Sequence, residues 1–232
     1  PSSDVTLTYS GIPTKTIYGF FPYWMLEQQN KVNITGYTDI ALFGLTADNK
    51  GNIITSINNE PEPGWTMWND SRLDTFIRRA KGKNAKVALV IKSFKNDDIE
   101  GIINSNENQS RLIANSVQLM NSKSLDGINI DFEYVGEPDQ KTRDNFTRFI
   151  ANLNTEMKRQ NPDSQLTIDT YVGSASDDNF FDIQGLSNHV DAFVIMGYDI
   201  HTPNGDPGPV SPLAPGGGRA RGGSGRHLWG RR

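Results

Sequence analysis

The chain has 232 residues, a formal net charge of −4, 35% hydrophobic residues and 22% charged residues, which is the composition of an ordinary globular protein. This slightly acidic balance supplies no basic field, so we expect no nucleic-acid partner. No apolar run reaches the roughly 20 residues of a membrane helix, so no membrane partner is expected either. Cysteine is absent and the three histidines are far apart, which excludes disulfides and thiolate sites and leaves no metal and no cofactor expected.

Short β-rich runs alternate with longer helical runs after a polar N-terminal lead-in, residues 1–15. The predicted strands are 16–23, 39–45, 86–91, 127–133, 165–172 and 190–198. Their nearly continuous apolar content is typical of parallel strands that are covered on both faces. The alternation of strands and helices therefore predicts βα units and a parallel sheet.

Two of the intervening helices have clear signals in the sequence. Ser71 is a suitable N-cap for a helix whose apolar residues recur at helical spacing. Pro138 and Asp139 precede the clearest helix, which we expect to end at Lys158 and Arg159. Its predicted buried stripe consists of Phe146, Phe149, Ile150, Leu153 and Met157.

Six such units can be counted, whereas a closed barrel needs eight strands and about 250 residues. We therefore predict a (β/α)8 TIM-barrel type of fold, truncated to about six βα units, with residues 16–213 as a partial catalytic barrel. The Gly/Arg-rich segment 214–232 has no periodicity and is interpreted as a disordered tail or an expression scar. The abrupt change after Leu213 suggests truncation or a frame shift of a longer barrel, so we also expect self-association through open barrel edges.

The chemistry is concentrated in the predicted strand at 126–134. Its side chains alternate between Ile128, Ile130 and Phe132 on one face and Asn129, Asp131 and Glu133 on the other. Two acids on the interior face of a buried strand are costly unless they are used or neutralised. Because Asp131 and Glu133 resist ionising together, one can stay protonated near neutral pH, as a general acid for a glycosidic oxygen requires. A metal site and an inert structural role are the alternatives.

The same pair differs from the usual two-carboxylate arrangement of glycosidases. Those enzymes place one carboxyl on each side of the scissile bond. Neighbours on one strand cannot easily do so, so a different nucleophile is needed. The 2-acetamido oxygen of the substrate is the obvious candidate.

The pattern Asp126-Gly127-x-x-x-Asp131-x-Glu133 resembles the signature of family 18 glycoside hydrolases, the chitinase-like family. Residues 18–24 resemble the first strand of that family, 196–199 its sixth-strand motif, and 208–213 the loop that follows. This resemblance implies a retaining, substrate-assisted hydrolysis of β-1,4 bonds in N-acetylglucosamine polymers.

The resemblance also implies a role for each matching residue. Glu133 would protonate the leaving oxygen and later activate water, and Asp131 would orient the acetamido group and stabilise an oxazolinium ion. Tyr198 would donate its hydroxyl to the acetamido oxygen. Asp199 and Met196 would line the same substrate subsite.

Some positions depart from the family pattern. Asn129 stands where many chitinases carry a further Asp, and the positions matching the Tyr and Ser that hold this Asp read Phe20 and Val90. These three changes look like one coordinated switch, which indicates a subfamily. Asn129, Phe20 and Trp24 are predicted substrate contacts. Trp24 is predicted because sugars present apolar faces to aromatic rings and because it follows the carboxyl end of the first strand. For Trp24 and the other loop aromatics, Tyr23, Trp65 and Trp68, ordinary packing is the alternative.

We therefore expect a secreted, bacterial chitinase whose partner is chitin or another N-acetylglucosamine oligosaccharide. A peptidoglycan or spore-cortex N-acetylglucosaminidase is a rival, because Asn-Ile-Asp-Phe-Glu resembles that branch as closely. A catalytically weak, chitin-binding lectin-like barrel is the rival from another class. The presence of both Asp131 and Glu133 argues against it, and the missing last two strands argue for it.

Overall fold

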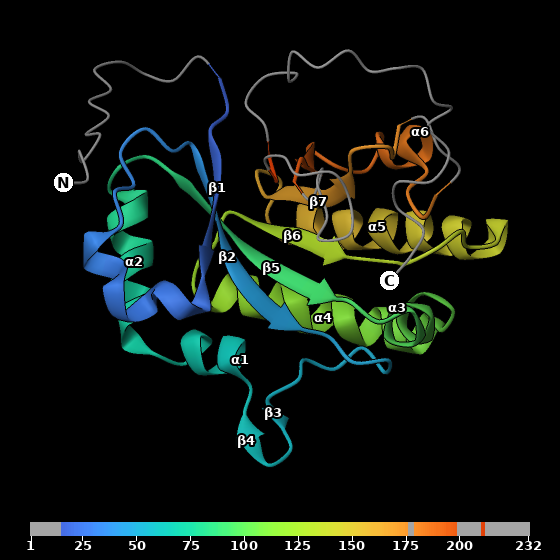
Figure 1. Ribbon diagram of the computed structural model, residues 1–232, viewed down its shortest axis with the longest axis horizontal. Helices are drawn as coiled ribbons and strands as arrows, with labels where there is room; N and C mark the ends of the chain where they lie inside the picture. The colour runs from blue at the N-terminus through green and yellow to red at the C-terminus, as the bar shows by residue number, and fades with distance from the viewer. Residues whose placement is uncertain (1–14, 176–178, 199–209, 212–232) are drawn as a thin grey trace.

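Six parallel strands form the main sheet in the computed structural model, which describes residues 15–175, 179–198 and 210–211 (Figure 1). In their order across the sheet they are β1 (Tyr18–Pro22), β2 (Asp39–Thr46), β5 (Lys86–Ser93), β6 (Gly127–Phe132), β7 (Gln165–Tyr171) and β8 (Ala192–Met196). Each predicted strand is thus confirmed, with ends that differ by two residues or fewer. The order follows the chain, so each strand is joined to its neighbour by a crossover.

Helices fill most of the crossovers. They are the 3-10 helix η1 (Tyr23–Lys31) and the α-helices α1 (Pro63–Trp68), α2 (Ser71–Lys81), α3 (Asn96–Ile103), α4 (Asn106–Ser122), α5 (Gln140–Gln160) and α6 (Ile183–Leu186). A small antiparallel hairpin, β3 (Ser56–Ile57) and β4 (Glu60–Pro61), projects beyond α1 (Figure 1).

The start of α5 directly after Asp139 agrees with the prediction, whereas the cap of α2 differs from it. Asp139 caps α5, because its side chain accepts a hydrogen bond from the backbone N–H of Thr142 at 2.8 Å. The prediction that Ser71 is an N-cap is wrong. Asp70 takes that role for α2 by accepting from the N–H of Arg72 at 2.8 Å, since a carboxylate one residue earlier reaches the free amides of the first turn.

A hydrogen bond across the interior shows that the sheet is strongly curled. The hydroxyl of Tyr18 on β1 lies 3.1 Å from Oγ1 of Thr167 on β7. In the sheet, three strands lie between β1 and β7, namely β2, β5 and β6. In a flat sheet the two strands would be about 19 Å apart, from four spacings of about 4.8 Å, which these side chains cannot span. The sheet therefore bends as the wall of a barrel does, and the fold is of the (β/α)8 TIM-barrel type, represented by six βα units.

The outer face of the sheet supplies the hydrophobic core. Phe132 on β6 stacks on Phe149 of α5 with ring centroids 5.8 Å apart and an interplanar angle of 3°. All five residues of the predicted α5 stripe are buried: Phe146, Phe149, Ile150, Leu153 and Met157. This burial fixes Ile128, Ile130 and Phe132 outward and turns the alternate β6 residues inward.

The amino-terminal end of β6 is anchored by Asp126. One oxygen of its carboxylate accepts from the backbone N–H of Val87 at 2.8 Å, and the other accepts from the ammonium of Lys81 at 2.9 Å. Asp191 repeats this arrangement before β8, where it accepts from the N–H of Leu166 at 2.8 Å. Asp126 therefore supports the strand at its base and does not face the opposite, carboxyl end.

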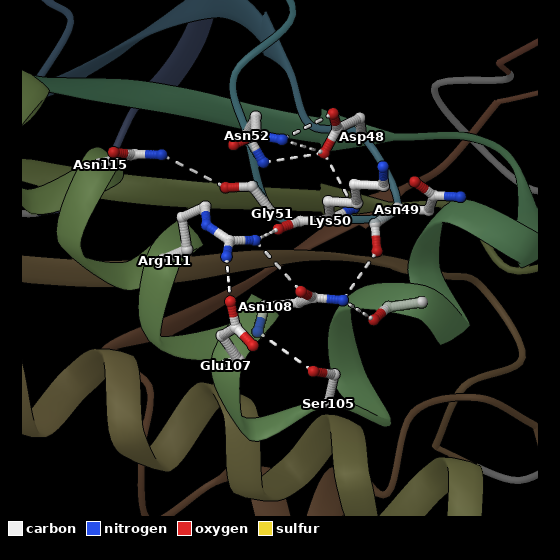
Figure 2. Close-up of polar contacts among 11 residues, drawn as sticks. Asp48, Asn49, Lys50, Gly51, Asn52, Ser105, Glu107, Asn108, Arg111 and Asn115 are labelled. Atoms are coloured by element: carbon white, nitrogen blue, oxygen red, sulfur yellow. Dashed lines mark hydrogen bonds and ion pairs between the residues drawn. The ribbon is translucent and has the colours of Figure 1, made fainter.

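The loop after β2 is clamped onto α4 (Figure 2). Asp48 tightens the loop by accepting from the backbone N–H groups of Lys50 and Asn52 at 2.9 and 2.8 Å. From α4, Asn108 donates to the carbonyl of Asn49 at 3.1 Å, and Arg111 donates to the carbonyl of Lys50 at 2.5 Å. The clamp joins the second and third βα units on the side of the sheet where the strands end.

The lead-in and the Gly/Arg-rich segment 214–232 lie outside the described residues, apart from Lys15, so the predicted domain bounds stay predictions. Within the described ranges, no helix is both long and apolar enough to cross a membrane.

Candidate active site

Asp131 and Glu133 leave β6 on the interior face of the curled sheet. Asp131 is 3% exposed, and it pairs in register with Lys92 of β5. Glu133 follows the last residue of β6 and is half-buried, and its backbone N–H donates to the carbonyl of Ser93 at 3.0 Å. The two acids thus lie at the carboxyl end of the sheet, where the active sites of such barrels are built.

Asn129 is buried one pleat below Asp131 and links β6 to β7. Its amide donates to Oγ1 of Thr167 at 3.0 Å and to Oδ1 of Asp169 at 3.1 Å. The predicted neighbours of Asn129 at Phe20 and Val90 do not supply these bonds. They come from Thr167 and Asp169 of β7, which were not predicted as site residues. The signal for them is that Thr167, Asp169 and Tyr171 alternate as polar residues in an apolar run.

Asp169 is a further buried carboxyl, 3% exposed, and it follows the Ile130–Ile168 pair of the β6–β7 ladder on β7 as Asp131 does on β6. Burial raises the pKa of Asp131, and the negative charges of Asp169 and then of Glu133 raise it further. Burial also raises the pKa of Asp169, although the hydrogen bond from Asn129 opposes this rise. The expected coupling of Asp131 with Glu133 is present, but the coupling with Asp169 is the stronger of the two.

Lys92 lies beside this acidic group at the end of β5. It is 8% exposed, and its Nζ is 4.0 Å from Oε1 of the buried Glu62. Burial lowers the pKa of Lys92, whereas the charges of Glu62 and Asp131 oppose that effect. The rings of Phe43 and Tyr23 also face the ammonium, with centroids 4.9 and 5.6 Å away. This cation was not predicted to belong to the site, and it lowers the pKa of Asp131.

Tyr171 and Tyr198 are two further tyrosines, at the ends of β7 and β8. The hydroxyl of Tyr171 donates to the carbonyl of Tyr134 at 3.1 Å. Burial raises the pKa of Tyr171, and the negative charges of Glu133 and Asp131 raise it further. Tyr198 is 46% exposed and Met196 is buried at the end of β8. The predicted residue Asp199 lies outside the described residues.

Aromatic side chains flank the opposite side of the mouth. Trp24 is 61% exposed and Phe20 is 42% exposed, and both pack edge-on against Phe43 with centroid distances of 6.1 and 6.5 Å. Trp68, in contrast, is buried beneath the ammonium of Lys123, so packing explains it. Phe20, Trp24 and Phe43 thus form an exposed aromatic surface above Lys92.

The geometry is that of two carboxyls with different environments at the open end of a curled parallel sheet. A model of glycosyl hydrolases family 18 matches residues 16–227 of the chain. The chain belongs to this family. In the part of the chain that the structure describes, no set of three or more His, Asp or Glu residues is arranged to hold a metal ion.

Three known proteins illustrate the range of relatives within and around the family. A Bacillus subtilis protein named as a sporulation-specific glycosylase, YdhD, is 29% identical over 144 residues, which are 60% of this chain and 33% of YdhD. The spore cortex-lytic enzyme SleL of Bacillus cereus has a TM-score of 0.65 at 18% identity, covering 86% of this chain and 45% of SleL. A family 18 chitinase of Cycas revoluta, solved with (GlcNAc)3, has a TM-score of 0.63 at 19% identity, covering 79% of this chain and 55% of that chitinase.

The family 18 chain spans a third of the length of YdhD and about half of the two solved enzymes. The likeness to the solved structures is one of fold. It supports the barrel type with six βα units.

Proposed function

We propose that this family 18 chain hydrolyses β-1,4 bonds in N-acetylglucosamine polymers, with chitin as the substrate and Glu133 as the acid and base. The observation that carries the proposal is the position of Glu133, half-buried at the end of β6, beside the fully buried Asp131. A carboxyl that must donate and accept a proton needs neighbours that bring its pKa close to the working pH. Its neighbours here are one cation and two further carboxyls, all on the interior face.

The reaction consists of two displacements at one anomeric carbon. Glu133 gives its proton to the glycosidic oxygen as the bond from that oxygen to the anomeric carbon breaks. The acetamido oxygen of the same sugar bonds to that carbon and forms an oxazolinium ion. Glu133, now a carboxylate, then takes a proton from water. The water oxygen attacks the anomeric carbon and breaks its bond to the acetamido oxygen, which opens the oxazolinium ring. Two inversions give net retention.

Each remaining member of the site has a task in this scheme. Asp131 accepts from the acetamido N–H and stabilises the positive charge of the oxazolinium ion. Tyr198 donates its hydroxyl to the acetamido oxygen, with Met196 lining the same subsite. Trp24 and Phe20 offer exposed ring faces to sugars bound further along the mouth, where stacking buries the apolar face of a sugar.

Glu133→Gln tests the assignment. The amide keeps the shape of the side chain but cannot donate a proton, so hydrolysis of chitin oligosaccharides should fall by roughly 10²–10⁴-fold while binding is retained. Product release and the anomer formed first would be followed by NMR, with the β anomer expected. Glu137→Gln is the matched control, because Glu137 is an exposed carboxylate four residues further on. Equal activity of Glu133→Gln and Glu137→Gln would remove Glu133 from the mechanism.

A peptidoglycan of the spore cortex is the second candidate substrate. The observation that favours it is the 29% identity with a protein named as a sporulation-specific glycosylase. The same assay decides between the two, since wild-type protein would release products from peptidoglycan and not from chitin. Either substrate lies outside the cytoplasm of the cell that uses it, so we propose a secreted bacterial enzyme. Binding of oligosaccharide without any hydrolysis would instead identify a lectin-like barrel.

A further inference from the structure

Asp131 and Asp169 lie side by side on neighbouring strands. The ladder between β6 and β7 pairs Asn129 with Thr167 and Ile130 with Ile168. Asp131 and Asp169 are the next residues of the two strands, so both side chains point to the interior at the same level. Both side chains are 3% exposed, so two charges here would face each other away from water. Neighbouring carboxyls resist ionising together, so one of them keeps a proton that it can donate to the other.

Asn129 distinguishes the two acids. Its amide donates to Oδ1 of Asp169, and such a bond favours the ionised form of the acid that accepts it. Oδ1 of Asp131, in contrast, is buried without a hydrogen-bond partner. The arrangement therefore keeps the negative charge on Asp169 and the proton on Asp131.

The carboxyl that can share a proton with Asp131 comes from the neighbouring strand β7. On β6 itself, the inward residue before Asp131 is Asn129, which has no carboxyl. An amide does not titrate, so Asn129 has no proton to share with Asp131. Among the described residues, the buried carboxyls are Glu62, Asp131 and Asp169. Glu62 caps α1 by accepting from the N–H of Trp65 at 2.7 Å and lies next to Lys92, so Asp169 remains for Asp131.

We propose that Asp169 is a positioning residue that shares one proton with Asp131 and so sets the charge that Asp131 presents to Glu133. Its meaning for catalysis rests on the proposed function. While Glu133 still holds its proton, the proton shared by Asp131 and Asp169 keeps two negative charges from facing each other in the buried interior. As Glu133 gives up its proton, passage of the shared proton to Asp169 leaves Asp131 ionised, and Asp131 then supplies the counter-charge that the oxazolinium ion needs.

Other charged and titratable groups surround the pair and contribute to its behaviour. Lys92 faces Asp131 from β5 and favours its ionised form. Glu133 opposes ionisation of both acids from the end of β6. The hydroxyls of Tyr171 on β7 and of Tyr18 on β1 also face the pair, and burial raises the pKa of each. None of these groups changes in the variants used below.

A carboxyl titration tests the shared proton directly. Wild-type protein with carbon-13 in the aspartate carboxyl carbons would be titrated by NMR from about pH 4 to about pH 10, beyond the ordinary range of aspartate. We expect the Asp131 and Asp169 resonances each to move in two steps, with the upper step near or above neutrality. A single step for each acid, near the ordinary aspartate value, would overturn the proposal.

Asp169→Asn provides the second test, because the amide can still accept from Asn129 but carries no charge. The titration midpoint of Asp131 should fall by roughly one pH unit or more, and its second step should vanish. Thr167→Val is the matched control. It removes the other acceptor of Asn129 without changing any charge, and should leave both steps in place. An unchanged Asp131 midpoint in Asp169→Asn contradicts the proposal.

The proposal can still be tested if the Asp169→Asn variant does not fold or if the protein has no hydrolytic activity. If Asp169→Asn does not fold, the two-step titration of the wild-type protein decides alone. The readout needs no hydrolysis, so an inactive Glu133 would contradict the proposed function and leave the shared proton measurable. Conversely, independent titration of the two acids in an active protein would refute the shared proton alone.

Discussion

At the residue scale, burial disfavours the charged forms of the two acids on the interior face. Asp131 and Asp169 are each 3% exposed and are raised in pKa chiefly by that burial, so their ionisation opposes folding. The nearest cation, Lys92, is itself desolvated and has Glu62 as its first partner. The interior face therefore holds acidic groups whose ionisation lowers the stability of the fold, and perturbed groups of this kind are common at sites that transfer protons.

The raised pKa values of these buried carboxyls predict that the stability of the protein falls as the pH rises. A carboxyl whose pKa is raised in the folded state binds more protons there than in the unfolded chain, whose aspartates titrate near 3.8. The free energy of unfolding should therefore decrease between about pH 5 and about pH 8, by at most about 1.4 kcal/mol per pH unit for each proton. Urea unfolding at several pH values measures this, and Asp131→Asn should flatten the decrease.

Asp163→Asn is the control for that measurement, because Asp163 is exposed in a loop. It should follow the wild-type curve throughout. A wild-type protein that gains stability over this pH interval relative to Asp131→Asn would contradict the sign of the effect.

At the scale of elements, the β2 loop and α4 approach each other closely (Figure 2). Gly51 has a φ of +76°, and a Cβ atom there would lie 2.2 Å from the carbonyl oxygen of Asn108. The carbonyl of Gly51 also accepts from Asn115 of α4 at 3.3 Å. The two backbones are in direct contact at this point. The loop therefore cannot move away from α4 without breaking the hydrogen bonds that join them.

Gly51→Ala should therefore be markedly destabilising. Gly136 is the matched control, since its φ is +93° but a Cβ there would meet nothing within 4 Å. Both substitutions incur the strain of a left-handed alanine, roughly 1–2 kcal/mol, and only Gly51→Ala adds a clash. We expect the loss of unfolding free energy to be larger by about 1 kcal/mol or more for Gly51→Ala, measured by urea denaturation. Equal losses would show that the loop adapts.

At the scale of the molecule, the curled sheet has two outer strands. Within the described residues, β1 pairs only with β2 and β8 pairs only with β7. Ile195 on β8 is 63% exposed. An outer strand with unpaired backbone groups and apolar side chains is a template for association with another chain.

We therefore expect concentration-dependent self-association, and Ile195→Lys should reduce it. A lysine on an outer strand opposes pairing because its charge would be buried in the contact. Ile57→Lys is the matched control, since Ile57 is 49% exposed on the β3–β4 hairpin. Sedimentation velocity over a range of concentrations is the measurement. A wild-type protein that stays monomeric, or an equal effect of the two substitutions, would refute association through β8.

Much of the fold and the centre of the candidate site could be predicted from local patterns. The six strands follow from apolar runs of the right length, and the inward direction of Asp131 and Glu133 follows from their alternation with Ile130 and Phe132. The same alternation along β7 predicts that Asp169 points inward, but it does not predict the neighbour of Asp169. That Asp169 lies next to Asp131 depends on the register between β7 and β6.

The sequence by itself determined the βα order, the family signature and the two acids at the end of β6, because strand alternation and helical spacing are properties of consecutive residues. The tertiary structure alone decided which groups meet inside the curl. It brought Tyr18 to Thr167 across the sheet, Asn129 to Asp169, and Lys92 to Asp131. Sheet curvature and burial create these contacts between residues distant in the chain, and the same burial raises the pKa values of the acids, so no local pattern could have contained them.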